Sequence, residues 1–230
     1  MLVQLIGDLL PAAVGVALSP VPIVAVVLML GTASARRNGP AFALGWIVGL
    51  VAISTIVLLF AGGADDPDSG ASDTVNVVEL LFGLLLLALA VKAWRSRPEP
   101  GTEAALPGWM SAVDRFTPMR SFAIGATLSG LNPKNVALTM AASATIAQYG
   151  VSAGGDAVAV ATFVTLASLT VVGPVVAYLA LGERTAPALE QAKTFMAANN
   201  AVIMTVVCLV LAWPGVMRVP VPRLTAFGSP

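Results

Sequence analysis

Long apolar stretches alternate with short polar connections along this chain. A helix that crosses a membrane needs about 20 mainly apolar residues, and six stretches reach that length, each predicting a transmembrane helix. They cover residues 5–30, 41–61, 75–94, 121–147, 157–181 and 198–217. The pattern therefore predicts an all-α membrane protein with six transmembrane helices.

The longest polar stretch, residues 95–120, divides the six apolar stretches into two groups of three. We expect residues 1–94 and 121–217 to form two three-helix repeats, with 95–120 as a cytoplasmic linker and 218–230 as a tail. The linker either contains a short interfacial helix around residues 109–116 or is a flexible tether.

Charge supports a membrane location and predicts an orientation. Only 10% of the residues are charged, 57% are hydrophobic and the mean hydropathy is +0.89, whereas a soluble domain has about 25% charged residues. The first, third and fifth connections hold nine of the twelve basic residues, while residues 62–74 hold four aspartates and no base. The positive-inside rule then puts those three connections in the cytoplasm. We expect a multi-pass protein of the bacterial inner membrane with both termini outside.

An internal repeat relates the two groups of helices. The segment LSPVPI at residues 18–23 resembles LNPKNV at residues 131–136, at an offset of 113 residues. The same offset brings the second and third apolar stretches onto the fifth and sixth. Because each half has three spans, the halves must have opposite orientations in the membrane. Inverted repeats of this kind recur in secondary transporters.

Prolines interrupt the first helix of each half. Pro20, Pro22 and Pro133 lie inside apolar stretches at corresponding places. A proline inside a helix removes a backbone donor, and in lipid such a break survives where it faces protein or a wet cavity. The breaks are either kinks at packing contacts or the paired breaks that mark a transport site near the membrane midplane.

Lys134 is a cation within the fourth apolar stretch. A charge near the bilayer centre costs about 2.5–3.5 kcal/mol on insertion scales, so this lysine needs a partner, a ligand or water. Asp8 and Glu79, toward the outer ends of their helices, are the candidate coupling acids. Lys134 either awaits a substrate anion such as phosphate, sulfate or carboxylate, or extends to the cytoplasmic interface near Arg120.

Further polar residues surround the breaks. Ser19 precedes Pro20, and asparagines flank the lysine. The candidate substrate-binding residues are Ser19, Pro20, Pro22, Asn132, Pro133, Lys134 and Asn135. The fifth stretch also carries hydroxyl residues, most of which we expect to bond their own helix; they include Thr162, Thr165, Ser168 and Thr170.

Gly45 and Gly49 form a GxxxG pair in the second stretch. Small residues at this spacing let two membrane helices approach closely. The contact lies either within one protomer or between the copies of a homodimer.

Several kinds of chemistry are absent from the sequence. Histidine is absent, and the single cysteine, Cys208, cannot form a pair within the chain. The chain contains neither a phosphate-binding GxxxxGK[ST] motif nor an evident carboxylate dyad or metal cluster. The formal net charge is zero, which argues against nucleic acid as a partner. We expect no enzymatic activity, no metal and no cofactor.

The residues around the breaks carry a family resemblance. The stretches are DLLPA at 8–12, ALSPVPI at 17–23, ARRNG at 35–39, GW at 45–46 and NPK at 132–134. With the six-helix size, they resemble the LysE-type exporter superfamily, and more specifically its GAP branch of glycopeptidolipid- or sulfolipid-addressing proteins. The resemblance implies export, with Pro20, Pro22 and the NPK motif lining the transport site. The sequence SPVP replaces the usual proline-glycine-proline of the amino-acid exporters, which argues against an amino-acid substrate.

Three hypotheses follow. The first is a secondary exporter or flippase for an anionic lipid-linked or glycolipid substrate of the cell envelope, working among membrane lipids. The second is an exporter of amino acids or other small solutes. The third is a non-transporting accessory subunit of a larger lipid-export complex, in which the prolines and glycines serve packing.

Overall fold

The computed structural model of the chain describes residues 1–61, 84, 87–88, 90–92, 94–95 and 108–217. Within these ranges the regular elements are all helical. The α-helices are α1 (Leu2–Ala17), α2 (Pro20–Leu30), α3 (Ala35–Ala61), α5 (Pro118–Gly130), α6 (Pro133–Gln148), α7 (Ala153–Leu181) and α8 (Ala186–Met217), and the 3-10 helices are η1 (Gly108–Arg115) and η2 (Gly182–Thr185).

Local sequence explains where these helices begin. Proline is the first residue of α2, α5 and α6, a position where its missing N–H costs nothing and its fixed φ suits the helix. Thr117, Asn132 and Ser152 each accept a backbone N–H of the following helix on their side-chain oxygen. These capping residues define the starts of α5, α6 and α7.

The described residues contain two or three of the six predicted membrane spans. Among the described residues, Ala35–Leu59 and Ala153–Met196 are long and apolar enough to cross a membrane, and α1 with α2 makes a third if that bent pair is one span. The predicted fourth stretch, 121–147, is divided into α5 and α6. The predicted third stretch, 75–94, and the tail lie largely or wholly outside the described residues. The six-span inverted repeat and its division into domains therefore remain predictions.

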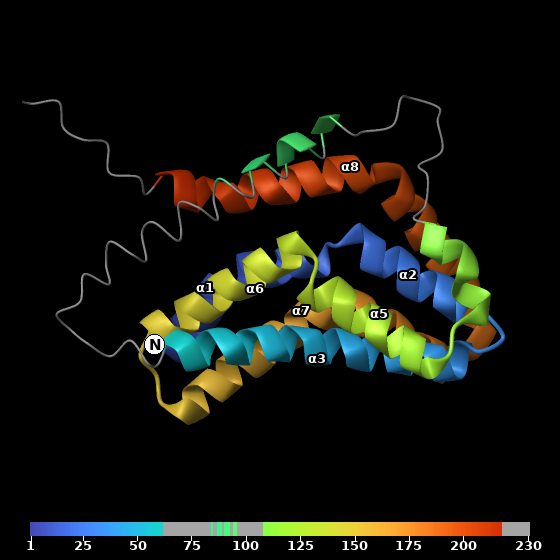
Figure 1. The fold of residues 1–230 in the computed structure, drawn as a ribbon, viewed down its shortest axis with the longest axis horizontal. Helices are drawn as coiled ribbons and strands as arrows, with labels where there is room; N and C mark the ends of the chain where they lie inside the picture. The colour runs from blue at the N-terminus through green and yellow to red at the C-terminus, as the bar shows by residue number, and fades with distance from the viewer. Residues whose placement is uncertain (62–83, 85–86, 89, 93, 96–107, 218–230) are drawn as a thin grey trace, which may run out of the picture.

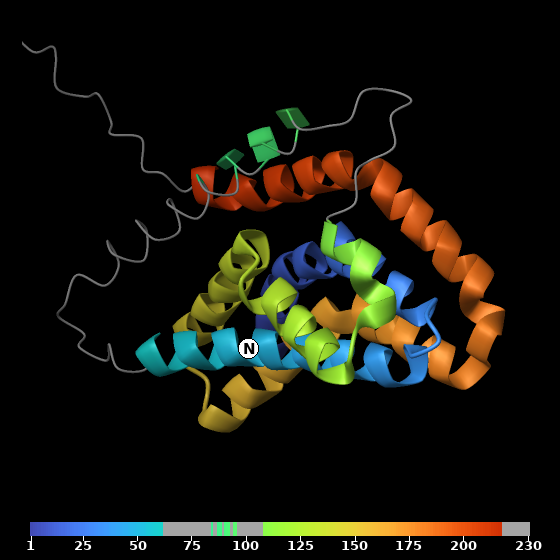
Figure 2. The same cartoon turned by 45° about the vertical axis from the view of Figure 1, so that its right-hand side comes forward.

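The broken helices of the two halves run in opposite directions. In Figure 1, α1 and α2 run from left to right, whereas α5 and α6 run from right to left. Figure 2 shows the same helices after rotation, with α8 passing over one side of the others. An inverted repeat requires this reversal. Helices α1 and α3 each pack against both α6 and α7, around fully buried Leu5, Leu9, Trp46, Ile146 and Phe163.

The predicted GxxxG pair makes its contact within the chain. An added Cβ would lie only 2.0 Å from the Phe122 carbonyl oxygen at Gly45, and 2.0 Å from the Ser129 hydroxyl at Gly49. Gly125 on α5 is equally close to α3, with the Phe42 carbonyl oxygen 2.2 Å from its Cβ position. The absence of side chains on these glycines lets α3 and α5 lie parallel in backbone contact. Gly45 and Gly49 thus contact α5 of the same chain, and the homodimer stays a prediction.

The linker ends in ordered structure. Helix η1 covers Gly108–Arg115, where the sequence indicated either a short helix or a tether. After it, the Phe116 carbonyl accepts a hydrogen bond of 2.9 Å from the side-chain amide of buried Asn38 at the start of α3. The end of the linker is therefore attached to the first half.

Candidate functional site at the paired helix breaks

Both halves contain a helix broken before a proline. Helix α1 ends at Ala17 and α2 begins at Pro20, with a bend of 56° between them. Helix α5 ends at Gly130 and α6 begins at Pro133. The residues before the prolines, Ser19 (φ −93°, ψ 105°) and Asn132 (φ −71°, ψ 118°), are both extended, because proline disfavours the helical conformation of the residue that precedes it. The predicted breaks are confirmed, at positions related by the repeat.

The two breaks meet in space. The Ser19 hydroxyl donates a hydrogen bond of 2.8 Å to the side-chain oxygen of Asn135, and both residues are buried. The amine of Lys134 donates one of 2.7 Å to the carbonyl oxygen of Gly15. The start of α6 thus lies against the end of α1. The two helices run antiparallel from there, because the hydroxyl of Tyr149 at the end of α6 donates to the Asp8 carboxylate, at 2.5 Å.

Side chains satisfy the carbonyls that the breaks release. A helix end leaves its last carbonyls without backbone donors. In α1, Gly15 accepts from Lys134, and the carbonyl of Ala17 accepts from the Thr170 hydroxyl of α7 at 2.6 Å. In α5, the carbonyl of Leu128 accepts from the Asn135 amide at 3.0 Å. Side chains at the start of α6 therefore bond to the ends of both α1 and α5.

The 113-residue sequence offset relates the two carbonyls that α6 binds. Leu128 lies 113 residues after Gly15, the offset that relates the breaks. The neighbouring residues Lys134 and Asn135 bind these two equivalent carbonyls. In both halves a side chain of α6 thus donates to a carbonyl near the end of the preceding broken helix. The donor is the cationic amine of Lys134 for Gly15 and the neutral amide of Asn135 for Leu128.

Lys134 is buried at this junction. Only 1% of the residue is exposed, so its side chain does not extend to the surface of this structure. Its ammonium lies at the C-terminal end of α1, where the helix dipole favours a positive charge. Asp8 contacts Tyr149 at the far end of α6, and Glu79 lies outside the described residues.

The other candidates have separate places. Pro20 and Pro22 are buried in the first turn of α2, whereas Pro133 is exposed. Asn132 accepts the backbone N–H of Lys134 at 3.1 Å and so caps its own helix. The junction therefore brings together Ser19, Lys134 and Asn135, while Asn132 and the prolines shape the backbone around them.

Sequence reasoning missed the backbone acceptors at Gly15, Ala17 and Leu128, since nothing in a side chain marks them. Among the hydroxyls of α7, Thr162 and Thr165 bond their own helix as expected. Thr170 instead bonds α1. Only the position of Thr170 in the folded bundle distinguishes it from the others.

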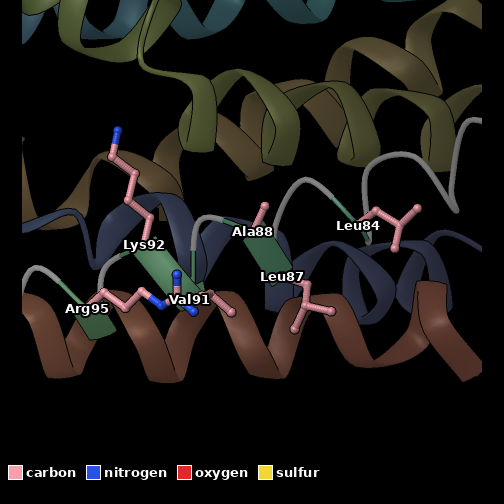
Figure 3. A pocket seen from close by; sticks show the side chains of 6 residues that line it. All are labelled: Leu84, Leu87, Ala88, Val91, Lys92 and Arg95. Atoms are coloured by element: carbon pink, nitrogen blue, oxygen red, sulfur yellow. The ribbon is translucent and has the colours of Figure 1, made fainter.

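Two hollows lie away from the junction. One, of about 700 Å³, is lined by Leu84, Leu87, Ala88, Val91, Lys92 and Arg95; Figure 3 shows Lys92 pointing to the opposite side from Leu87 and Val91. The other, of about 600 Å³, lies between the ends of α2 and α7 and the start of α8, and Tyr178, Glu183 and Glu190 contribute its polar groups. The residues that line these two hollows do not include Ser19, Lys134 or Asn135. The junction is closed in this conformation.

Within the described residues, no three side chains of the His, Cys, Asp or Glu type gather as they would around a metal ion. What the junction offers instead is one buried cation, a hydroxyl, an amide and two helix N-termini. These groups can bind an anion or a hydrogen-bonding headgroup.

Comparison with known proteins gives one family. No curated protein and no solved structure matches the chain. The sequence does match the family described as "Sap, sulfolipid-1-addressing protein" over residues 9–215. This match agrees with the likeness to the sulfolipid-addressing proteins and leaves the wider LysE likeness as a resemblance. Because it covers most of the chain, including both helix breaks, the chain belongs to the sulfolipid-1-addressing protein family.

Proposed function

We propose that the protein is a secondary membrane transporter, an exporter or flippase, for an anionic lipid-linked or glycolipid substrate of the cell envelope. One observation carries the proposal: the broken helices meet at a buried cation, Lys134, whose amine bonds the carbonyl of Gly15. Buried charges in membrane proteins are expensive and are usually functional. The family's name refers to a sulfolipid, and a sulfolipid headgroup is an anion.

The proposed cycle uses the same lysine in two ways. In the closed junction, the amine of Lys134 binds the carbonyl of Gly15. In the loaded state, the substrate anion takes the place of that carbonyl, because an anion is a stronger acceptor than a neutral carbonyl. Breaking that bond removes one of the contacts that hold α1 against α6, so substrate binding is coupled to movement of one half against the other. Alternating access in repeat transporters is movement of this kind.

The orientation follows the same proposal. The opposite directions of the broken helices in the two halves support an inverted arrangement. The distribution of basic residues supports an inner-membrane orientation with both termini outside. Asp8 is the described candidate for ion coupling. It lies near the middle of α1, beside Tyr149 at the end of α6.

A second function has its own support. Lys134 has a structural role in this conformation, since it caps a helix end, and Gly45 and Gly49 serve packing. These are the roles that an accessory subunit of a larger lipid-export complex would give them. Transport of small solutes such as amino acids is the third candidate.

Reconstitution separates these functions. The purified protein is placed in phosphatidylcholine vesicles with a fluorescent sulfated glycolipid in both leaflets, and dithionite quenching reports lipid that moves outward. Faster movement than in protein-free vesicles, with thermal stabilisation by the sulfated glycolipid, supports the lipid transporter. Stabilisation and flux with amino acids alone support the solute exporter. Absence of both, with co-purification of a larger pump from native membranes, supports the accessory subunit.

A further inference from the structure

Three helices that pack against one another each hold a buried hydroxyl without a hydrogen-bond partner. They are α3, α6 and α7, and within the described part of the chain no partner is found for the hydroxyls of Ser54, Thr139 and Ser168. All three residues are at most 3% exposed. A buried unsatisfied hydroxyl destabilises a fold, and an isosteric apolar residue would avoid that cost.

Other unpartnered buried atoms have a different setting. They belong to Asn38, Trp46 and Ser121. Asn38 and Trp46 lie in the first half of α3 and Ser121 in the first turn of α5, where these two helices pack closely. Ser54, by contrast, lies in the second half of α3, and Thr139 and Ser168 lie on α6 and α7.

Thr139 extends the polar side of the junction along α6. Asn135, Thr139 and Ser143 follow one another at intervals of four residues, so they share one face of the helix, and all three are fully buried. Asn135 bonds Ser19 at the breaks, and Ser143 donates to the carbonyl of Thr139 at 2.8 Å. The hydroxyl of Thr139 is therefore the unpartnered group of this face, one turn beyond the junction.

We propose that Thr139, with Ser54 and Ser168, lines the part of the translocation path next to the breaks and binds the sugar hydroxyls of a glycolipid headgroup. The inference rests on the proposed transport function and assigns the carbohydrate part of the substrate. A sugar hydroxyl both donates and accepts hydrogen bonds without charge, as the side chains of serine and threonine do. One helical turn, about 5.4 Å, separates Thr139 from the first turn of α6, where Lys134 takes the anion.

The chemistry divides the headgroup between two places. The cation at the break selects the charge, and the neutral hydroxyls select the sugar. These hydroxyls gain partners when the helices separate around the substrate, so a group that costs stability in the closed state contributes to binding in the loaded one.

The test compares three fluorescent lipids in proteoliposomes: a sulfated diglycosyl lipid, its unsulfated counterpart and phosphatidic acid, which has an anion and no sugar. Thr139→Val is expected to slow both glycolipids by about two- to tenfold, the value of one hydrogen bond to a neutral group, and to leave phosphatidic acid movement unchanged. Its apparent Tm should equal or exceed that of the wild type. Thr139→Ser, which keeps the hydroxyl, should move both glycolipids at about the wild-type rate.

Thr145→Val is the matched control on α6, since the hydroxyl of Thr145 donates to the carbonyl of Ala141 at 3.0 Å. Thr145→Val should leave the transport rates of all three lipids unchanged. Ser168→Ala, on α7, should slow both glycolipids as Thr139→Val does. If Thr139→Val and Ser168→Ala move both glycolipids at the wild-type rate, the inference is wrong and the transport function stands. If the wild type moves no lipid, both are wrong.

Discussion

The amine of Lys134 lies 2.7 Å from the carbonyl oxygen of Gly15, although 119 residues separate them in the chain. This bond joins the end of α1 to the start of α6, and so one half of the chain to the other. A broken helix in lipid needs partners for its free carbonyls, and here the partner is the cation at the second break. Lys134 thus both holds the two halves together and belongs to the candidate transport site.

A second bond across the junction can be measured by itself. We expect a double-mutant cycle of Ser19→Ala and Asn135→Leu to give a coupling energy of about 0.6–1.7 kcal/mol, the range for hydrogen bonds between membrane helices. Asn135→Leu alone should be the more destabilising of the two, because it also leaves the carbonyl of Leu128 without its side-chain donor. Reversible unfolding in mixed micelles measures each value. Additive effects would show that the bond from Ser19 to Asn135 contributes nothing.

The contact between α3 and α5 predicts a strong effect from one methyl group. We expect Gly45→Ala to destabilise the protein by about 1–3 kcal/mol, because the new Cβ meets the backbone of Phe122 and α5 must move away. Gly173→Ala is the matched control in α7, since nothing lies within 4 Å of its Cβ position and alanine favours the helix. Thermal unfolding in detergent compares them. Equal Tm values for the two variants would contradict the close contact.

The contact of Asp8 with Tyr149 predicts a titration. The hydrogen bond to the Asp8 carboxylate raises the pKa of Tyr149 above its usual 10.0, because ionisation breaks the bond and places a second negative charge beside the first. Asp8→Asn should lower this pKa toward 10.0. The stabilisation from the bond is present below pH 10 and is lost as pH rises through the raised pKa.

The absorbance of tyrosinate at 295 nm follows this titration in a Tyr178→Phe background, since the chain has only two tyrosines. Tyr149→Phe in that background should abolish the signal. A pKa of Tyr149 that is unchanged by Asp8→Asn would show that the contact does not form in solution.

The sequence predicted the backbone of the site better than its bonds. Pro20 and Pro133 identified both breaks because proline constrains its own residue and the one before it. The partner of Lys134 was not predictable, since the acceptor is a backbone carbonyl that has no sequence signature. For the same reason, Thr170 could not be separated from Thr162 and Thr165, which bond their own helix.

The number of spans shows a different limit. Hydropathy found the apolar stretches but could not say that residues 121–147 form two helices with a break between them. The pair Gly45 and Gly49 predicted a close contact, and only the fold identified α5 as its partner. Spacing along one helix carries no information about which other helix lies against it.

The proposed transport cycle requires Lys134 to exchange the carbonyl of Gly15 for a substrate anion. The most direct measurement is the ratio of outward movement of sulfated to unsulfated glycolipid in proteoliposomes, for the wild type, Lys134→Met and Thr170→Val. Thr170→Val is the structural control, because it also removes a donor to a carbonyl at the end of α1 but leaves the charge. We expect the wild type and Thr170→Val to prefer the sulfated lipid, and Lys134→Met to lose this preference. A Lys134→Met protein that keeps the wild-type preference would contradict the claim.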